Sequence, residues 1–151
     1  MRTLLLLSVF AVSCGATAID VARGTLTTAA VATVAADQAF GTAYGIASEA
    51  ARKSSTTQQE KDWKMTDWDK AADDMEHAQA LARASLVTAE VAVDGFERTG
   101  DAGYWDEAIA CVAESLRRIA HVLEERGLHI PAALAKVLTL SEGLTCAASV
   151  R

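Results

Sequence analysis

The chain has 151 residues, of which 51% are hydrophobic, and its formal net charge is −6. This length accommodates one domain with a substantial core and leaves no room for a second. The acidic balance argues against nucleic acid as a partner, because binding to a phosphate backbone depends on an excess of Lys and Arg. A single proline, nine glycines and abundant alanine favour helices over strands.

The first eighteen residues have the pattern of an export signal. Arg2 supplies a positive charge, and residues 4–12 form an uncharged, mostly apolar run. Nine helical residues extend only about 14 Å, which is too short to span a bilayer core of roughly 30 Å. We therefore expect residues 1–18 to direct export and not to remain as a transmembrane helix.

Two processing sites overlap in this segment. Residues 11–14, with the sequence AVSC, resemble the lipobox of bacterial lipoproteins. This resemblance implies that Cys14 is lipidated and becomes the first residue of the mature chain, although Ala11 stands where the lipobox prefers leucine. The alternative is ordinary cleavage after Ala18, at an A-x-A site. We expect the lipidated form.

An amphipathic helix is predicted for residues 19 to about 53. Small or apolar residues recur there at steps of three and four, as a helical seam requires. They are Ile19, Ala22, Leu26, Ala29, Thr33, Ala36, Phe40, Tyr44, Ala47 and Ala51. Residues 54–59 (SSTTQQ) lack this periodicity and predict a connection.

A second helix is predicted to begin near Thr66, with a start one or two turns earlier as the alternative. Thr66 and Asp69 have the spacing of a helix cap, in which both side chains accept hydrogen bonds from free backbone N–H groups. The apolar stripe that follows consists of Trp68, Ala72, Met75, Ala82, Leu86, Ala89, Val93 and Phe96. Gly100 ends the pattern.

Two further helices complete the predicted fold. Asp101 is expected to cap the third, which ends at Gly127 and whose inward residues are Trp105, Ala108, Val112, Leu116, Ile119 and Leu123. Pro131 is expected to be the first residue of the fourth, and Gly143 is placed to end it early. Residues 19–151 are thus predicted to form one all-α domain, an antiparallel bundle of three to four helices.

Cys111 and Cys146 remain in the folded domain whichever processing site is used. An even number of cysteines in an oxidising compartment favours a disulfide. The position midway between them falls in the turn at 127–131, so the two thiols would stand level on facing antiparallel helices. We predict a Cys111–Cys146 disulfide; the alternative is two separate buried cysteines.

Four alternating helices would place the N-terminal end and the turn at 99–100 at one pole of the bundle. The connection at 54–66 and the turn at 127–130 would lie at the other pole. Trp63, Met65 and Trp68 fall at this second pole, and exposed tryptophans are common anchors of protein interfaces. We predict that they contact a partner; the alternative is that the tryptophans close the end of the core.

No catalytic or metal-binding pattern is recognisable in the sequence. His77, His121 and His129 fall on separate predicted elements, and none has the spacing that places two ligands on one helical face. A phosphate-binding glycine loop, a G-x-S-x-G elbow and a C-x-x-C pair are also missing. We predict a protein that is not an enzyme and uses no metal or cofactor.

The order of elements resembles the small lipoproteins encoded by bacterial and tailed-phage genomes. The resemblance implies a cellular location and no activity. The location is the periplasm, where a lipid on Cys14 would tether the protein to a membrane of the cell envelope. We expect an interaction module with an unknown envelope protein as its partner. The alternatives are a phage lysis or superinfection-exclusion accessory lipoprotein, and a soluble periplasmic chaperone or inhibitor, which would require cleavage after Ala18. The oligomeric state stays open.

Overall fold

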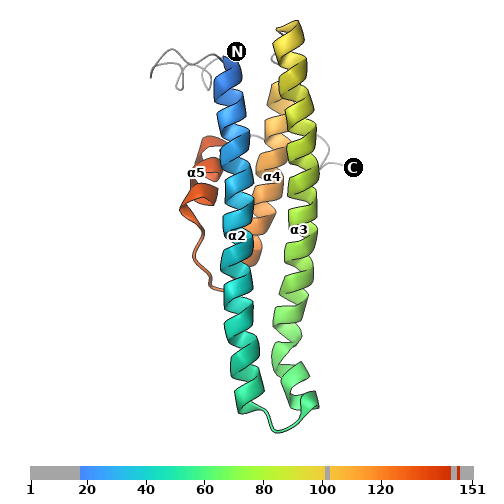
Figure 1. Ribbon diagram of the computed structural model, residues 1–151, viewed down its shortest axis with the longest axis vertical. Helices are drawn as coiled ribbons and strands as arrows, with labels where there is room; N and C mark the ends of the chain where they lie inside the picture. Colours follow the sequence, from blue (N-terminus) through green and yellow to red (C-terminus); the bar gives the residue numbers. More distant parts are fainter. Residues whose placement is uncertain (1–17, 101–102, 144–145, 147–151) are drawn as a thin grey trace.

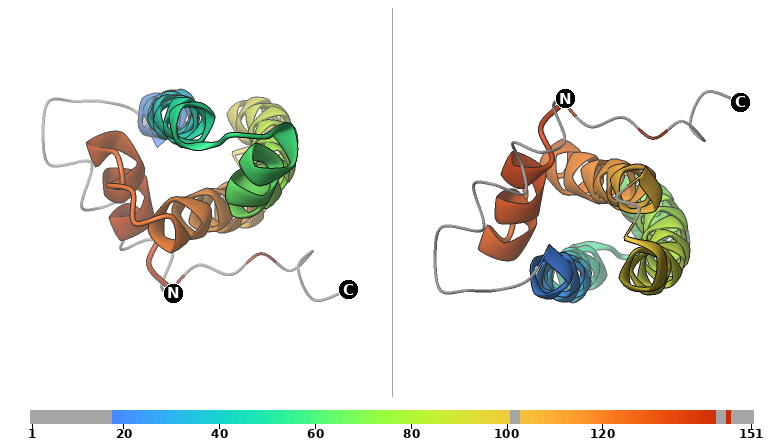
Figure 2. Two further views of the ribbon diagram at one scale, coloured as in Figure 1. Left: turned by 90° about the horizontal axis from the view of Figure 1, so that it is seen from below. Right: turned by 90° about the horizontal axis from the view of Figure 1, so that it is seen from above.

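The computed structural model describes residues 18–100, 103–143 and 146, which form four α-helices. These are α2 (Ala18–Ser54), α3 (Gln58–Thr99), α4 (Gly103–Glu125) and α5 (Ala132–Leu140). Viewed end-on, the helices surround one core, with α3 between α2 and α4, and α5 closing the gap between α4 and α2 (Figure 2). The predicted all-α bundle is confirmed. The export signal, Cys14 and the Asp101 cap lie outside the described residues.

The helices differ greatly in length. α2 has 37 residues, α3 has 42 and α4 has 23, which correspond to about 55, 63 and 34 Å. α4 therefore covers little more than half of α3, and one end of the α2–α3 hairpin projects beyond it (Figure 1). The turn at 127–130 lies beside Trp68, as predicted, because the neighbouring Arg126 contacts the Trp68 ring. The turn does not reach the end of the hairpin, since Trp68 is ten residues into α3 and the α2–α3 connection lies about 15 Å further on.

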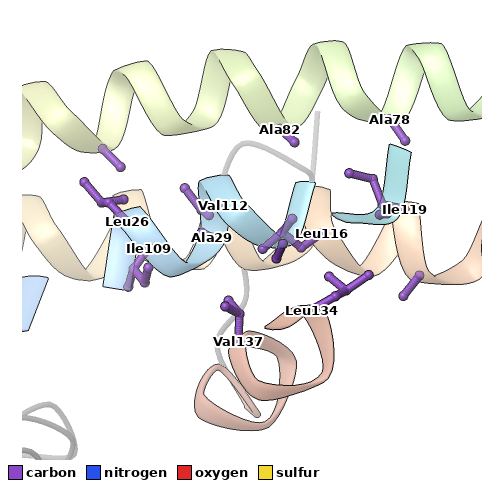
Figure 3. Packing of buried hydrophobic residues seen from close by; sticks show 14 of the residues in the cluster. Leu26, Ala29, Ala78, Ala82, Ile109, Val112, Leu116, Ile119, Leu134 and Val137 are labelled. Atoms are coloured by element: carbon purple, nitrogen blue, oxygen red, sulfur yellow. The ribbon is translucent and has the colours of Figure 1, made fainter. Parts of the chain in front are cut away.

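Small residues line α2 and α3 where they face each other and the core. The buried alanines of these two helices are Ala22, Ala29, Ala32, Ala36, Ala51, Ala71, Ala78, Ala82 and Ala89. The large, fully buried side chains come mostly from the other two helices and are Leu116, Ile119, Leu123, Leu134, Val93, Val112 and Val137. Bulky residues of α4 and α5 thus fill the space left by the alanines (Figure 3), which gives the dense packing of a protein interior. All six predicted inward residues of α4 are buried.

The start of α3 differs from the main expectation. Thr57 is the N-cap, and its hydroxyl oxygen accepts a hydrogen bond from the N–H of Glu60 at 3.2 Å. Thr66 instead lies inside the helix, where its hydroxyl donates to the carbonyl of Asp62. The earlier start, one or two turns before Thr66, is therefore confirmed. The polar residues Gln58 and Gln59, read as connection, form the first turn because the Thr57 cap satisfies a free N–H group.

Glycines end α3 and α4 as the sequence indicates. Gly100 has φ 70°, and its N–H donates to the carbonyl of Phe96 at 2.8 Å. Gly127 has φ 66°, and Leu128 donates across it to Leu123 at 2.9 Å, as in a Schellman motif. Pro131 is the N-cap of α5 and not its first residue, although its carbonyl accepts the first helical hydrogen bond of α5, from Ala135.

Candidate functional site

The projecting end of the α2–α3 hairpin, residues 46–65, is the most distinctive surface of the described chain. We call it the hairpin tip. Its Trp63 side chain is 76% exposed and Ile46 is 67% exposed, and they are the two most exposed large apolar residues of the described chain. Because tryptophan is enriched among the residues that anchor protein interfaces, Trp63 marks this end as the leading candidate for a contact surface.

The three residues predicted to contact a partner do not share a surface. Trp63 lies outside, as expected. Met65 is only 4% exposed, so its assignment as a surface contact is wrong: it lies on the side of α3 that packs within the hairpin. Trp68 is half-buried and packs against the core cluster. The structure therefore leaves Trp63 as the accessible residue of the three.

Trp68 belongs to an aromatic cluster that closes the core where α4 ends. Its ring centroid lies 6.0 Å from that of Phe40 and 6.4 Å from that of Tyr44. The guanidinium carbon of Arg126 lies 5.9 Å from the Trp68 ring centroid, a cation–π distance. The Tyr44 hydroxyl donates to Asp69 at 2.6 Å, and this hydrogen bond raises the pKa of Tyr44, because ionisation would remove the donor. Trp68 therefore closes the end of the core, which was the alternative to a contact with a partner.

A network of hydrogen bonds fixes the turn between α2 and α3. One oxygen of the Glu60 carboxylate accepts from the N–H of Thr56 at 2.9 Å, and the other accepts from the Lys64 ammonium at 2.7 Å. Lys64 also donates to the carbonyl of Ser54, the last residue of α2, at 3.0 Å. We call this network the turn lock. The T-x-x-E spacing of Thr57 and Glu60 is the sequence signal that would have located it.

The turn lock predicts a specific dependence of stability on pH. Hydrogen bonds from Lys64 and then Thr56 lower the pKa of Glu60 from 4.5 to about 2. A lowered pKa in the folded state contributes stability above pH 4.5 that is lost as the pH falls towards 2. We expect Glu60→Gln to lower the melting temperature at neutral pH and to flatten the wild-type decline over this acidic range, measured by circular dichroism.

Glu49→Gln provides the control, because Glu49 also has a pKa of about 2, but through Arg52 and Lys53 of its own helix. This variant should keep the part of the acid-induced loss of stability that comes from protonation of Glu60. Superimposable pH profiles for wild type and Glu60→Gln would show that the turn lock adds no stability.

A disulfide joins Cys111 of α4 to Cys146, with a Cα–Cα distance of 4.6 Å. The predicted pairing is thus present, but Cys146 does not lie on a helix that faces α4, as was expected. α5 ends at Leu140, and Gly143 follows with φ 81°, so Cys146 reaches α4 from the segment after the helix. The carbonyl of Ser141 accepts from Arg117 of α4 at 3.0 Å. Two contacts therefore tie the segment after α5 to α4.

A groove of about 1070 Å³ runs along the outside of α3 and α4. Leu81, Val91 and Ala92 of α3 contribute apolar surface to it, and both bridged cysteines lie in its wall. His77 and Arg118 also line it, together with acidic and hydroxyl side chains of α3 and α4. Most of the exposed surface of the lining is apolar.

The histidines lie apart. His77 lines the groove, His121 faces Glu125 at 3.4 Å, and His129 is exposed in the connection before α5. Across residues 18–100, 103–143 and 146, no three His, Cys, Asp or Glu side chains are placed to hold a metal ion. Within the same ranges, no helix combines the length and the apolar character needed to cross a bilayer.

Comparison with known proteins adds no relative from which a role could be transferred. No protein-family model matches the chain, and neither the curated proteins nor the solved structures contain a significant match.

Proposed function

We propose that this chain is an exported, non-enzymatic protein of the bacterial cell envelope, tethered to a membrane by a lipid on Cys14, that binds an envelope partner through the hairpin tip. The observation that carries the proposal is the Cys111–Cys146 disulfide. Structural disulfides form and persist in oxidising compartments and are rare in the cytosol. The disulfide therefore agrees with the export signal of residues 1–18.

The length of α2 supports the choice of the hairpin tip. α2 begins at Ala18, four residues after Cys14, and its 37 residues extend about 55 Å to Ser54. A lipid on Cys14 would hold the first end near the membrane, whereas the hairpin tip lies at the other end of the helix (Figure 1). The turn lock keeps that end ordered, and a pre-ordered surface loses less conformational entropy when it binds.

The first test compares partner capture by single-site variants of the full, exported chain. A photo-crosslinking amino acid at position 59, which is exposed one helical turn before Trp63, should capture an envelope protein, whereas the same group at position 87 should not. Val87 is the matched control because it is also exposed, at 62%, and lies on α3 away from the hairpin tip. Trp63→Ala should lower recovery of the captured protein about tenfold, as expected of an interface anchor, and should leave the melting temperature unchanged. Equal recovery with wild type and Trp63→Ala would refute the role of the tip.

The second test concerns the tether. Mass spectrometry of the mature N-terminus should find acyl chains on Cys14. A mature chain that begins at Ile19 would instead remove the tether and favour a soluble periplasmic chaperone or inhibitor.

A further inference from the structure

One side of α3 stays exposed from the hairpin tip to the end of α4. Trp63, Asp67, Lys70 and Asp74 follow one another at steps of four, three and four residues, so they lie on the same side of the helix. All four are exposed, and we call them the Trp63 face. This face continues the hairpin tip along α3, which extends well past the end of α4 (Figure 1).

A small cleft forms where the Trp63 face meets the end of α4. Its volume is about 270 Å³, and its lining consists of Asp67, Lys70, Ala71, Asp74, Glu125 and Arg126. The cleft therefore adds the Glu125 carboxylate to those of Asp67 and Asp74, against two cations. The cation of Arg126 is already engaged, because it donates to the carbonyl of Asp67 at 3.4 Å and lies over the ring of Trp68.

The two carboxylates of the Trp63 face are available to a cation. On another side of α3, Asp69 accepts a hydrogen bond from Tyr44 at 2.6 Å. In the described part of the chain, by contrast, neither Asp67 nor Asp74 accepts a hydrogen bond at its carboxylate or forms an ion pair. A cationic ligand would therefore break no existing contact of these two groups.

The charge around the Trp63 face selects the sign of a partner. Residues 58–77 carry seven carboxylates and three lysines, a net charge of −4 in a chain whose total is −6. Their combined field attracts a cationic segment and repels an anionic surface such as a layer of phospholipid headgroups. The exposed ring of Trp63 favours the same sign, because a cation is attracted to the negative face of an aromatic ring.

We propose that the Trp63 face binds a basic segment of the envelope partner, through an arginine that stacks on the Trp63 ring and pairs with Asp67 or Asp74. Side chains four positions apart are neighbours on a helix, so a guanidinium over Trp63 lies within reach of the Asp67 carboxylate. A guanidinium suits both contacts, since its planar group stacks on aromatic rings while its N–H groups donate to a carboxylate. The protein contains an example of such stacking in Arg126, whose guanidinium carbon lies 5.9 Å from the Trp68 ring centroid. The inference rests on the proposed role of the hairpin tip and adds the chemistry of its partner.

The test is a titration of the full, exported chain in non-ionic detergent with a hexaarginine peptide. Isotope-labelled tryptophan lets nuclear magnetic resonance follow the indole N–H of Trp63, which Trp63→Phe identifies. Hexaarginine should shift this resonance, whereas hexaglutamate should leave it unmoved. Asp67→Asn/Asp74→Asn should weaken hexaarginine binding about fivefold, as expected for the loss of two exposed ion pairs. Lys70→Gln should strengthen it about twofold, because it removes a like charge from the same cleft.

The matched control is Asp73→Asn/Glu76→Gln. It changes the net charge by the same amount, but these two exposed residues lie about 120° around α3 from the Trp63 face. Its affinity for hexaarginine should stay within about twofold of wild type, because salt screens the more distant charges. An equal loss in both double variants would overturn the inference, since overall charge and not the Trp63 face would then govern binding. An unmoved Trp63 resonance would overturn it as well.

This titration requires no envelope partner, so its failure can be told from failure of the proposed function. Suppose that capture of an envelope protein depends on Trp63 while both double variants bind hexaarginine equally. The role of the hairpin tip would then stand, and only the inference of a basic, arginine-bearing partner would fall.

Discussion

Replacing Leu116 by alanine is expected to lower the free energy of unfolding by about 3 to 5 kcal/mol. Leu116 is fully buried in the middle of α4, between Ala82 of α3 and Leu134 of α5 (Figure 3). Its neighbours on α3 are alanines, whose short side chains cannot move in to fill the space, so most of the cavity would persist. A loss of this size is a large fraction of the roughly 5 to 15 kcal/mol that stabilises a typical domain.

Chemical denaturation of the oxidised protein, followed by circular dichroism, measures this loss. Val87→Ala is the control, because Val87 is 62% exposed and its truncation should change stability by no more than about 0.5 kcal/mol. A loss below about 1 kcal/mol for Leu116→Ala would show that the core collapses around the missing side chain.

Ala29→Leu is expected to destabilise the fold by about 1 to 3 kcal/mol although it adds apolar surface. Ala29 is 0% exposed, and it lies on the side of α2 that faces the core among other buried alanines. A methyl group fits there because bulky side chains of α4 already occupy the space (Figure 3). An isobutyl group would force the helices apart or push neighbouring side chains out of their preferred rotamers.

The adjacent Ala30 offers a direct comparison, because it is exposed on the same helix. Ala30→Leu introduces the same side chain with almost the same helix propensity, and its melting temperature should match that of wild type. If Ala29→Leu were as stable as Ala30→Leu, the buried alanines of α2 would be loosely packed, and the core would lack the density of a protein interior.

Local signals in the sequence were sufficient for a bundle of three to four helices and for most of the helix ends. Gly100 and Gly127 end their helices in the left-handed conformation that glycine adopts easily. The inward side of α4 followed from its spacing alone, because burial of one side of a helix repeats every 3.6 residues. The start of α3 was placed late because the Thr57 cap, whose partner Glu60 is three residues on, lies within a run of polar residues that has no apolar periodicity.

The candidate site was predicted only in part. The exposure of Trp63 is confirmed, and it followed from its place before the clear apolar stripe of α3, whereas its contact with a partner stays a prediction. Met65 was placed wrongly because its burial depends on contact with α2, which the pattern of α3 alone does not reveal. The pairing of Cys111 with Cys146 was predicted from their number and spacing, whereas the place of Cys146 outside any helix depends on how soon α5 ends.

By itself, the sequence determined the all-α fold class, the buried side of α4 and the identity of the disulfide partners. These properties depend on residues a few positions apart, or on the count of cysteines. Only the tertiary structure decided that α4 stops beside Trp68, that the hairpin tip projects, and that Cys146 is bonded to α4 from beyond the end of α5. The reason is that these features depend on contacts such as that of Arg126 with Asp67, 59 residues apart, and helical periodicity carries no information about such distant pairs.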